Sequence, residues 1–149
     1  STEGAMQLTT KGRYAVTAML DLASNNSNRP VTLDMISQRQ NISLSYLEQL
    51  FAKLRKASLV KSVRGPGGGY LLNQNPKEVT LTTIIEAVDE NIDLRRCHGM
   101  ENCFRGKQCL SHHLWCEVSD QIRDFLSTRN LQQVIDDYNQ NEKIKINNG

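Results

Sequence analysis

No stretch of the chain carries enough consecutive apolar residues to span a membrane. Hydrophobic residues make up 38% of the 149 positions, which is enough for a buried core, but polar residues interrupt every apolar run. From Met6 onward there is no charged and then apolar signal segment, because Lys11 and Arg13 lead into an amphipathic pattern. Residues 1–5 read as a cloning scar and are left out of the fold reasoning. We therefore expect a cytoplasmic protein with no membrane partner.

Cysteine is absent outside one short part of the sequence. The four cysteines are Cys97, Cys103, Cys109 and Cys116. A disulfide framework would spread over a small secreted domain, whereas clustered cysteines in a cytosolic chain more often bind metal. Paired Cys-x2-Cys motifs, the strongest zinc signal, are lacking. Loops of five residues between the first three cysteines indicate a group larger than a single ion.

The sequence also lacks the usual signals of catalysis. No nucleophile–base pair and no pair of substrate-fixing carboxylates stands out. The glycine-rich run at residues 65–69 is not followed by Lys-Ser/Thr and does not open a helix, so it is a poor match to a nucleotide phosphate loop. An enzyme is therefore not expected.

The charge is divided unequally between the two halves of the chain. Residues 6–72 hold nine Lys/Arg against three Asp/Glu, a net +6. Residues 73–149 hold nine Lys/Arg against twelve Asp/Glu, a net −3. A basic half joined to an acidic half indicates that one end binds a polyanion, although charge alone does not separate DNA from RNA or an acidic protein.

Hydrophobic periodicity predicts a helix-turn-helix in the basic half. Helices are expected over residues 8–23, 32–40 and about 43–57, with Thr32 capping the second. The third carries Leu47, Leu50, Phe51 and Leu54 at helical spacing, and either the capping box Ser45-x-x-Glu48 or Ser43 can cap it. Two short helices separated by about three residues are typical of a helix-turn-helix.

A β-hairpin is expected to follow, with strands at residues 59–64 and 70–72 around the glycine run. A hairpin in this position is a wing. The fold class is therefore mainly α with a small β-wing, a winged helix-turn-helix domain at residues 6–76 joined to a long dimerisation helix.

The acidic half is expected to hold a cluster-binding loop and helices at residues 77–138, followed by a flexible tail at 139–149. Helices are predicted over residues 81–88, 108–127 and 131–138, with a loop at 89–107. The long helix has an apolar stripe formed by Leu110, Leu114, Val118, Ile122 and Phe125. This stripe is broad for a helix in the acidic and exposed half of the chain. Packing within one chain and packing between subunits explain this stripe about equally well.

The second helix of a helix-turn-helix lies in the major groove, so its N-terminal polar residues are the candidates for reading bases. Gln49 can pair with adenine, and Glu48 can accept from cytosine or simply close the capping box. The residues expected to bind DNA are Lys11, Arg13, Ser43, Ser45, Tyr46, Glu48, Gln49, Lys53, Lys56, Lys61, Arg64, Gly65, Pro66 and Gly67. The lysines suit phosphates, and Arg64 suits a narrow minor groove.

Near the cysteines, His112 lies one turn after Cys109 on the expected long helix. Cys116 would lie roughly 10 Å along that helix from Cys109, which is far for ligands of one small cluster. We therefore expect Cys116 to be a buried apolar side chain rather than a ligand. His113 points away from the face of His112 and is the weaker ligand candidate, while His98 in the loop stays a possible ligand. Three thiolates and one imidazole suit a 2Fe–2S cluster, whose potential an imidazole ligand raises.

Three segments, residues 8–21, 42–51 and 63–72, together with the pattern Cys-x5-Cys-x5-Cys-x2-His, closely resemble the IscR family of iron–sulfur cluster regulators. The resemblance covers residues 6 to about 138. It implies a homodimer joined by the long helix, with one 2Fe–2S cluster per subunit on Cys97, Cys103, Cys109 and His112. It also implies binding to double-stranded promoter DNA and control of cluster-assembly genes, with the cluster-assembly machinery as a further candidate partner.

The resemblance further implies that Glu48 helps to exclude the cluster-free form from one class of promoter. Cys116 and His113 depart from the family pattern and leave another ligand set open, and the tail is shorter. Two alternatives remain at this stage: a related sensor of nitric oxide or iron with a different cluster, such as 4Fe–4S, and a cluster carrier that does not bind DNA.

Overall fold

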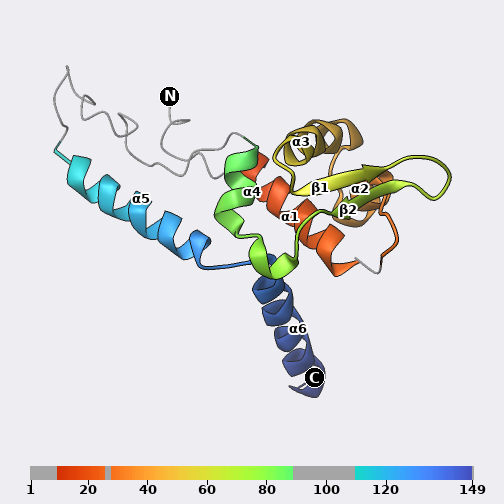
Figure 1. Ribbon diagram of the computed structural model, residues 1–149. Helices are drawn as coiled ribbons and strands as arrows, with labels where there is room; N and C mark the ends of the chain where they lie inside the picture. Colours follow the sequence, from red (N-terminus) through yellow and green to blue (C-terminus); the bar gives the residue numbers. More distant parts are fainter. Residues whose placement is uncertain (1–9, 26–27, 89–109, 149) are drawn as a thin grey trace.

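The computed structural model describes residues 10–25, 28–88 and 110–148. A compact head contains the first four helices and a β-hairpin, and the fifth helix projects from it to one side (Figure 1). The sixth helix starts against the head and points away from it. The head is built from the following elements: α1 (Thr10–Ser24), α2 (Leu33–Gln40), α3 (Leu44–Lys56), β1 (Val60–Val63), β2 (Gly69–Leu72), the 3-10 turn η2 (Pro76–Glu78) and α4 (Leu81–Ala87). The helices α5 (His112–Ser127) and α6 (Leu131–Asn148) complete the chain.

The core of the head confirms the helical periodicity seen in the sequence. The four apolar residues of α3, Leu47, Leu50, Phe51 and Leu54, are at most 2% exposed. They pack with Ala15, Met19 and Leu22 of α1 and with Ile36 of α2. Burial of each large side chain contributes about 1.5–3 kcal/mol, so this cluster fixes α3 on the head and leaves its opposite face in solvent.

The helix caps settle one alternative left by the sequence. Thr32 caps α2, as expected, by accepting a hydrogen bond from the backbone N–H of Met35. Ser43, rather than Ser45, is the N-cap of α3, and its hydroxyl accepts from the N–H of Tyr46. The capping box of Ser45 and Glu48 is therefore not the cap of this helix, because the helix begins two residues earlier than that motif requires.

The two strands pair antiparallel, with Val60 opposite Leu72 and Val63 opposite Gly69. The hairpin is also joined to the loop before α2, since Val31 and Tyr70 exchange two backbone hydrogen bonds of 2.9 and 2.7 Å. Gly69, at φ +150°, permits this approach. A Cβ there would lie 2.6 Å from the backbone carbonyl of Val31, so only glycine fits.

Two helix boundaries in the acidic half differ from the sequence prediction. The long helix α5 begins at His112 rather than near Gln108; Leu110 and Ser111 form a turn, and exposed Leu110 buries nothing that would extend the helix backward. The last helix does not end at Tyr138 but runs to Asn148. Neither glycine nor proline interrupts α6, and side-chain pairs such as Gln132–Asp136 and Glu142–Lys145 support it. The expected loop at residues 89–107 lies wholly outside the described residues.

In the part of the chain that the structure describes, no helix combines the length and the apolar character needed to cross a bilayer.

Candidate DNA-binding surface and cluster-ligand region

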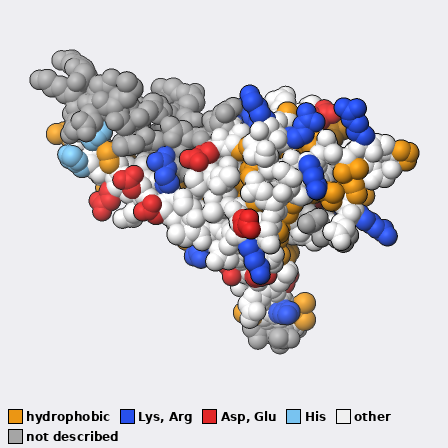
Figure 2. Space-filling view, viewed as in Figure 1, with side chains coloured by type: hydrophobic (Ala, Val, Ile, Leu, Met, Phe, Trp, Pro, Cys, Tyr) orange, Lys and Arg blue, Asp and Glu red, His pale blue; other side chains and the backbone are white. Residues whose placement is uncertain are grey.

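The outward face of α3 carries the polar residues predicted to read bases. Ser45, Glu48 and Gln49 are exposed near its N-terminal end, and Lys56 is exposed near its C-terminal end. Lys53 is half-buried. Lys and Arg side chains gather over α3 and the hairpin, whereas Asp and Glu side chains gather over α5 (Figure 2). The charge asymmetry of the sequence therefore corresponds to two separate surfaces of the molecule.

Tyr46 differs from its neighbours on α3. It is half-buried and packs against the core, and its ring lies edge-on to the ring of Tyr14 from α1, with centroids 5.7 Å apart at 80°. Tyr14 is not among the residues predicted from the sequence to bind DNA, yet its side chain is 39% exposed beside α3. Its residue type is the one sequence signal for this position, because a tyrosine combines an apolar ring, which can pack, with a polar hydroxyl, which can stay in solvent.

The wing residues stand in solvent at the far end of the hairpin. Lys61, Arg64, Gly65, Pro66 and Gly67 are all exposed. A hydrogen bond of 2.8 Å from the N–H of Gly68 to the carbonyl of Gly65 closes the tip. A short, closed loop with a single arginine at its base has the shape and charge needed to enter a narrow minor groove.

The two basic residues at the start of α1 point in different directions. Lys11 is half-buried and Arg13 is exposed. Arg13 lines a cleft with Leu81 and Ile85 of α4 and Leu126 of α5. The structure therefore places Arg13 beside the acidic half and does not bring it together with α3.

Of the four predicted cluster ligands, the structure places His112. It is the first residue of α5 and only 3% exposed, whereas the next residue, His113, is exposed. The two rings lie 5.7 Å apart in an edge-to-face arrangement. Cys97, Cys103 and Cys109, and the alternative His98, lie outside the described residues. The predicted place of Cys109 on the long helix therefore falls outside the part of the chain that is described, where α5 begins at His112.

Cys116 lies one turn after His112 on the same face of α5 and is half-buried. Ser119, buried at 2%, continues that face. Among the described residues, no three side chains of His, Cys, Asp or Glu come together in a way that would hold a metal ion. The chemistry of the full donor set, three thiolates and a buried imidazole, nevertheless fits a 2Fe–2S cluster.

The opposite face of α5 carries the predicted apolar stripe, and it is largely exposed. Leu110 is fully exposed, Leu114 is 53% and Phe125 55% exposed, while Val118 and Ile122 are half-buried. Trp115, beside the stripe, is 39% exposed. Packing within one chain therefore does not account for this stripe in the part of the molecule that is described.

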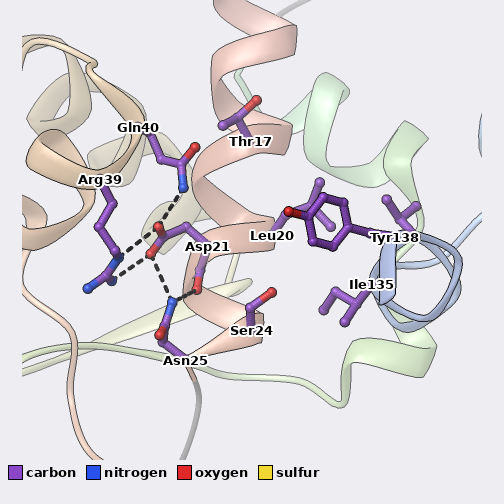
Figure 3. A pocket seen from close by; sticks show the side chains of 10 residues that line it. Thr17, Leu20, Asp21, Ser24, Asn25, Arg39, Gln40, Ile135 and Tyr138 are labelled. Carbon is purple, nitrogen blue, oxygen red and sulfur yellow. Dashed lines mark hydrogen bonds and ion pairs between the residues drawn. The ribbon is translucent and has the colours of Figure 1, made fainter. Parts of the chain in front are cut away.

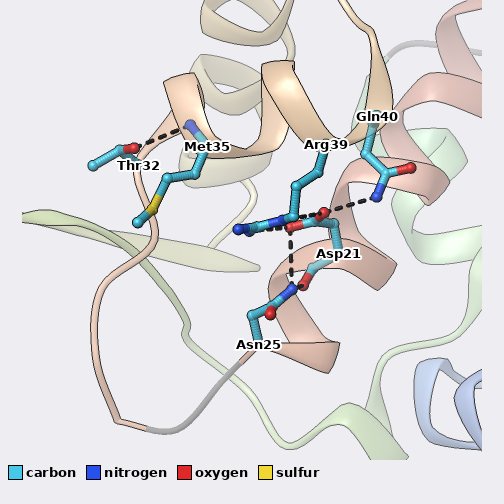
Figure 4. Close-up of polar contacts among 6 residues, drawn as sticks. All are labelled: Asp21, Asn25, Thr32, Met35, Arg39 and Gln40. Carbon is cyan, nitrogen blue, oxygen red and sulfur yellow. Dashed lines mark hydrogen bonds and ion pairs between the residues drawn. The ribbon is translucent and has the colours of Figure 1, made fainter.

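A cavity of about 400 Å³ lies away from α3, between α1, the end of α2 and α6 (Figure 3). Its polar end is the carboxylate of Asp21, which accepts hydrogen bonds from Arg39, Gln40 and Asn25 (Figure 4). Burial by itself would raise the pKa of Asp21, but these hydrogen bonds and the charge of Arg39 outweigh it, so the pKa is lowered. A carboxylate so fully engaged is suited to holding helices together.

These features define a winged helix-turn-helix protein that binds DNA. A family model described as that of iron-dependent transcriptional regulators, the Rrf2 family, matches residues 8–137. Among curated relatives, the transcriptional regulator IscR of Pectobacterium atrosepticum is 57% identical over 130 residues, covering 87% of this chain and 79% of that protein. IscR of Aliivibrio salmonicida is 54% identical over 153 residues, covering 97% and 90%.

Solved structures agree with the family match. IscR of T. potens has a TM-score of 0.71 at 37% identity, covering 87% of this chain and 86% of that one. CymR, the global cysteine regulator of B. subtilis, has a TM-score of 0.70 at 33% identity, covering 85% and 93%. The chain thus belongs to the Rrf2 family and is a transcription regulator; the relatives named here are regulators rather than enzymes.

Proposed function

We propose that this protein is a homodimeric transcription regulator that senses an iron–sulfur cluster held by Cys97, Cys103, Cys109 and His112. The observation that carries the proposal is the contrast between two adjacent histidines. His112 is buried at the start of α5, next to the segment that contains the three cysteines, while His113 is in solvent. A buried histidine beside a cysteine-rich segment is well placed to serve as a ligand, since neutral imidazole is the commonest protein ligand of metal ions.

A bound 2Fe–2S cluster would supply a redox-active and removable group whose presence can be read by the rest of the protein. The residues of this chain hold it and fix its place. His112 would ligate through a neutral imidazole, which binds iron less firmly than a thiolate does. The iron-dependent description of the family and the name shared by the relatives support this assignment.

The exposed stripe on α5 supports a dimer joined through that helix. Five apolar residues along one face, three of them at least 53% exposed, are expensive to leave in water. A second copy of the same helix offers a matching apolar stripe, as two-fold interfaces require. Two winged heads would then present two recognition helices to successive major grooves.

On DNA, we assign base reading to Ser45, Tyr46, Glu48 and Gln49, and minor-groove contact to Arg64 with Gly65, Pro66 and Gly67. Lys11, Ser43, Lys53, Lys56 and Lys61 would contact phosphates. Arg13 remains a phosphate candidate from sequence, although its place beside α4 and α5 favours a contact at the edge of the duplex. Glu48 is free of the capping box, which favours its role as a discriminator.

The test uses anaerobic reconstitution with iron and sulfide, followed by absorption spectra and counts of both elements. His112→Ala is compared with its neighbour His113→Ala, and Cys97→Ser with Cys116→Ser. We expect loss of the coloured centre in the first member of each pair only. Iron and sulfide counts of two each per subunit identify 2Fe–2S, and four each would indicate the related 4Fe–4S sensor.

DNA binding is tested on the same preparations. A duplex selected from a random-sequence pool by the wild-type protein serves as the specific probe, and a scrambled duplex is the competitor. Specific binding that changes between reconstituted and cluster-free protein supports a sensor. If the wild-type protein shows no preference for the selected duplex over the scrambled one, it is a cluster carrier. If the reconstituted and the cluster-free protein bind the selected duplex equally well, the sensing role is removed.

A further inference from the structure

A second cleft of about 480 Å³ lies between the first turn of α1 and the helix-turn-helix. It opens on the surface that carries the N-terminal end of α3. The residues that line it are Thr10, Tyr14, Asn41, Ile42, Ser43, Ser45, Tyr46 and Gln49. Seven of these eight carry a hydroxyl or an amide, and none is acidic. Such a lining offers hydrogen-bond donors without a negative charge to repel an anion.

Within the cleft, Tyr46 is held from two sides. Its backbone N–H donates to the hydroxyl of Ser43 at 3.3 Å, and that hydroxyl lies 3.1 Å from the hydroxyl of Ser45. Its ring rests against Tyr14 in the edge-to-face contact of 5.7 Å. Aromatic pairs of this geometry contribute beyond simple burial and have a preferred orientation. The position of Tyr46 on the reading face therefore depends on Tyr14, a residue of another helix.

Building on the DNA-binding function proposed above, we propose that this cleft holds a phosphodiester of the DNA backbone and that Tyr14 has two roles there. Its hydroxyl donates to the phosphate together with that of Thr10, and its ring orients Tyr46 toward the bases. Hydroxyl groups of Ser, Thr and Tyr are common phosphate contacts in DNA complexes. The cleft borders the N-terminal end of α3, the end of a recognition helix that enters the major groove, so the phosphates that flank the groove pass close to it.

The two roles are separated by two substitutions at one position. Tyr14→Phe removes the hydroxyl and keeps the ring against Tyr46, whereas Tyr14→Leu removes both. Thr10→Val removes the second hydroxyl. Tyr138→Phe, an exposed tyrosine on α6 far from α3, is the matched control. Dissociation constants are measured with the full-length, cluster-loaded protein on the selected duplex and on a scrambled duplex, after circular dichroism has verified that each variant is folded.

For Tyr14→Phe and Thr10→Val we expect roughly threefold to tenfold weaker binding to both duplexes, because a phosphate contact carries no sequence information. For Tyr14→Leu we expect a further loss that falls mainly on the selected duplex, so that its preference over the scrambled one drops. Tyr138→Phe should match the wild type.

Two results would overturn the proposal. If Tyr14→Phe and the wild type bind both duplexes equally, the hydroxyl contacts no phosphate. If Tyr14→Leu keeps the full preference for the selected duplex, Tyr14 does not orient Tyr46. Both outcomes leave the proposed DNA-binding function intact, since sequence-specific DNA binding fails only if the wild-type protein itself shows no preference between the duplexes.

Discussion

The carboxylate of Asp21 accepts two hydrogen bonds from the guanidinium of Arg39, at 2.7 and 3.0 Å. Gln40 adds a third at 2.8 Å. The side chain of Asp21 is 1% exposed and that of Arg39 is 39% exposed. This contact joins the last turn of α1 to the last turn of α2, and so fixes the first helix of the helix-turn-helix on the helix that precedes it.

Asp21→Asn is expected to lower the free energy of unfolding at pH 7 by about 1–2 kcal/mol, a value discounted for the solvent that reaches Arg39. The pKa of Asp21 is lowered in the folded protein, so its ionised form stabilises the fold. That stabilisation is fully present above about pH 4, the pKa of an unfolded aspartate, and is lost as the pH falls through the lower folded value. Urea denaturation at pH 7 and near pH 3 measures both effects.

The control for this prediction is Asp136→Asn, an exposed aspartate on α6 that also accepts a glutamine hydrogen bond. It should change stability by less than about 0.5 kcal/mol. A difference between Asp21→Asn and the wild type that is the same at both pH values would contradict the assigned role of the charge.

Gly69→Ala is expected to destabilise the protein by at least about 2 kcal/mol and to weaken DNA binding, because the new Cβ would lie 2.6 Å from the carbonyl of Val31. Gly67→Ala is the matched control in the same hairpin. Its Cβ meets nothing within 4 Å, so only the cost of its φ of +75° remains, about 1 kcal/mol. Thermal unfolding of both variants decides the matter, because Gly67 itself belongs to the proposed DNA contact; equal losses of stability would mean that the bridge to Val31 does not hold the wing.

Phe125→Glu is expected to convert the proposed dimer to a monomer, because it places a charge within the apolar stripe of α5. Asp120→Lys is the control, since it changes the charge of the exposed acidic face of the same helix by two units without touching the stripe. Sedimentation velocity reports the molecular mass of both variants. A dimer that survives Phe125→Glu would move the subunit interface to another surface.

Arg64→Ala should weaken binding to the selected duplex by roughly tenfold while leaving the visible spectrum of the cluster unchanged. Arg64 on the wing and His112 on α5 lie on different parts of the molecule, so the DNA-binding loss and the colour should be independent. Loss of colour in this variant would contradict the separate roles assigned to the wing and to the α5 region.

Glu48→Ala should broaden the set of sequences that the protein accepts, because a carboxylate near phosphates is tolerated only where a cytosine amino group satisfies it. Selection from a random-sequence pool with the variant and the wild type shows whether one position loses its cytosine. If the variant keeps the same base preference at every position of the selected DNA, Glu48 is a solvent-exposed residue that reads no base.

Local sequence signals predicted the head well. The spacing of Leu47, Leu50 and Phe51 fixed the buried face of α3, and the glycine run marked the turn of the wing. These features depend on neighbours a few residues away, so the sequence displays them directly. The contact of Tyr14 with Tyr46 joins residues 32 positions apart, and no local pattern encodes it.

The acidic half was harder to predict from sequence because its apolar residues are not all used in one chain. Periodicity extended α5 backward through Leu110, although that side chain buries nothing in the described structure. At α6 the reverse happened: few apolar residues follow Tyr138, yet side-chain pairs along the helix carry it on to Asn148. The assignment of the cluster ligands came from spacing and resemblance, and the burial of His112 is the one structural observation that bears on it.

The bridge between Val31 and Tyr70 has a consequence for how the head meets a duplex. The ring of Tyr70 also lies edge-to-face against Phe51 of α3, at 4.9 Å between ring centroids, so the hairpin cannot swing independently of the recognition helix. Groove and wing contacts therefore form together or not at all. The head therefore loses little conformational entropy when it binds DNA. It also cannot bend to fit a promoter whose major-groove and minor-groove features are wrongly spaced.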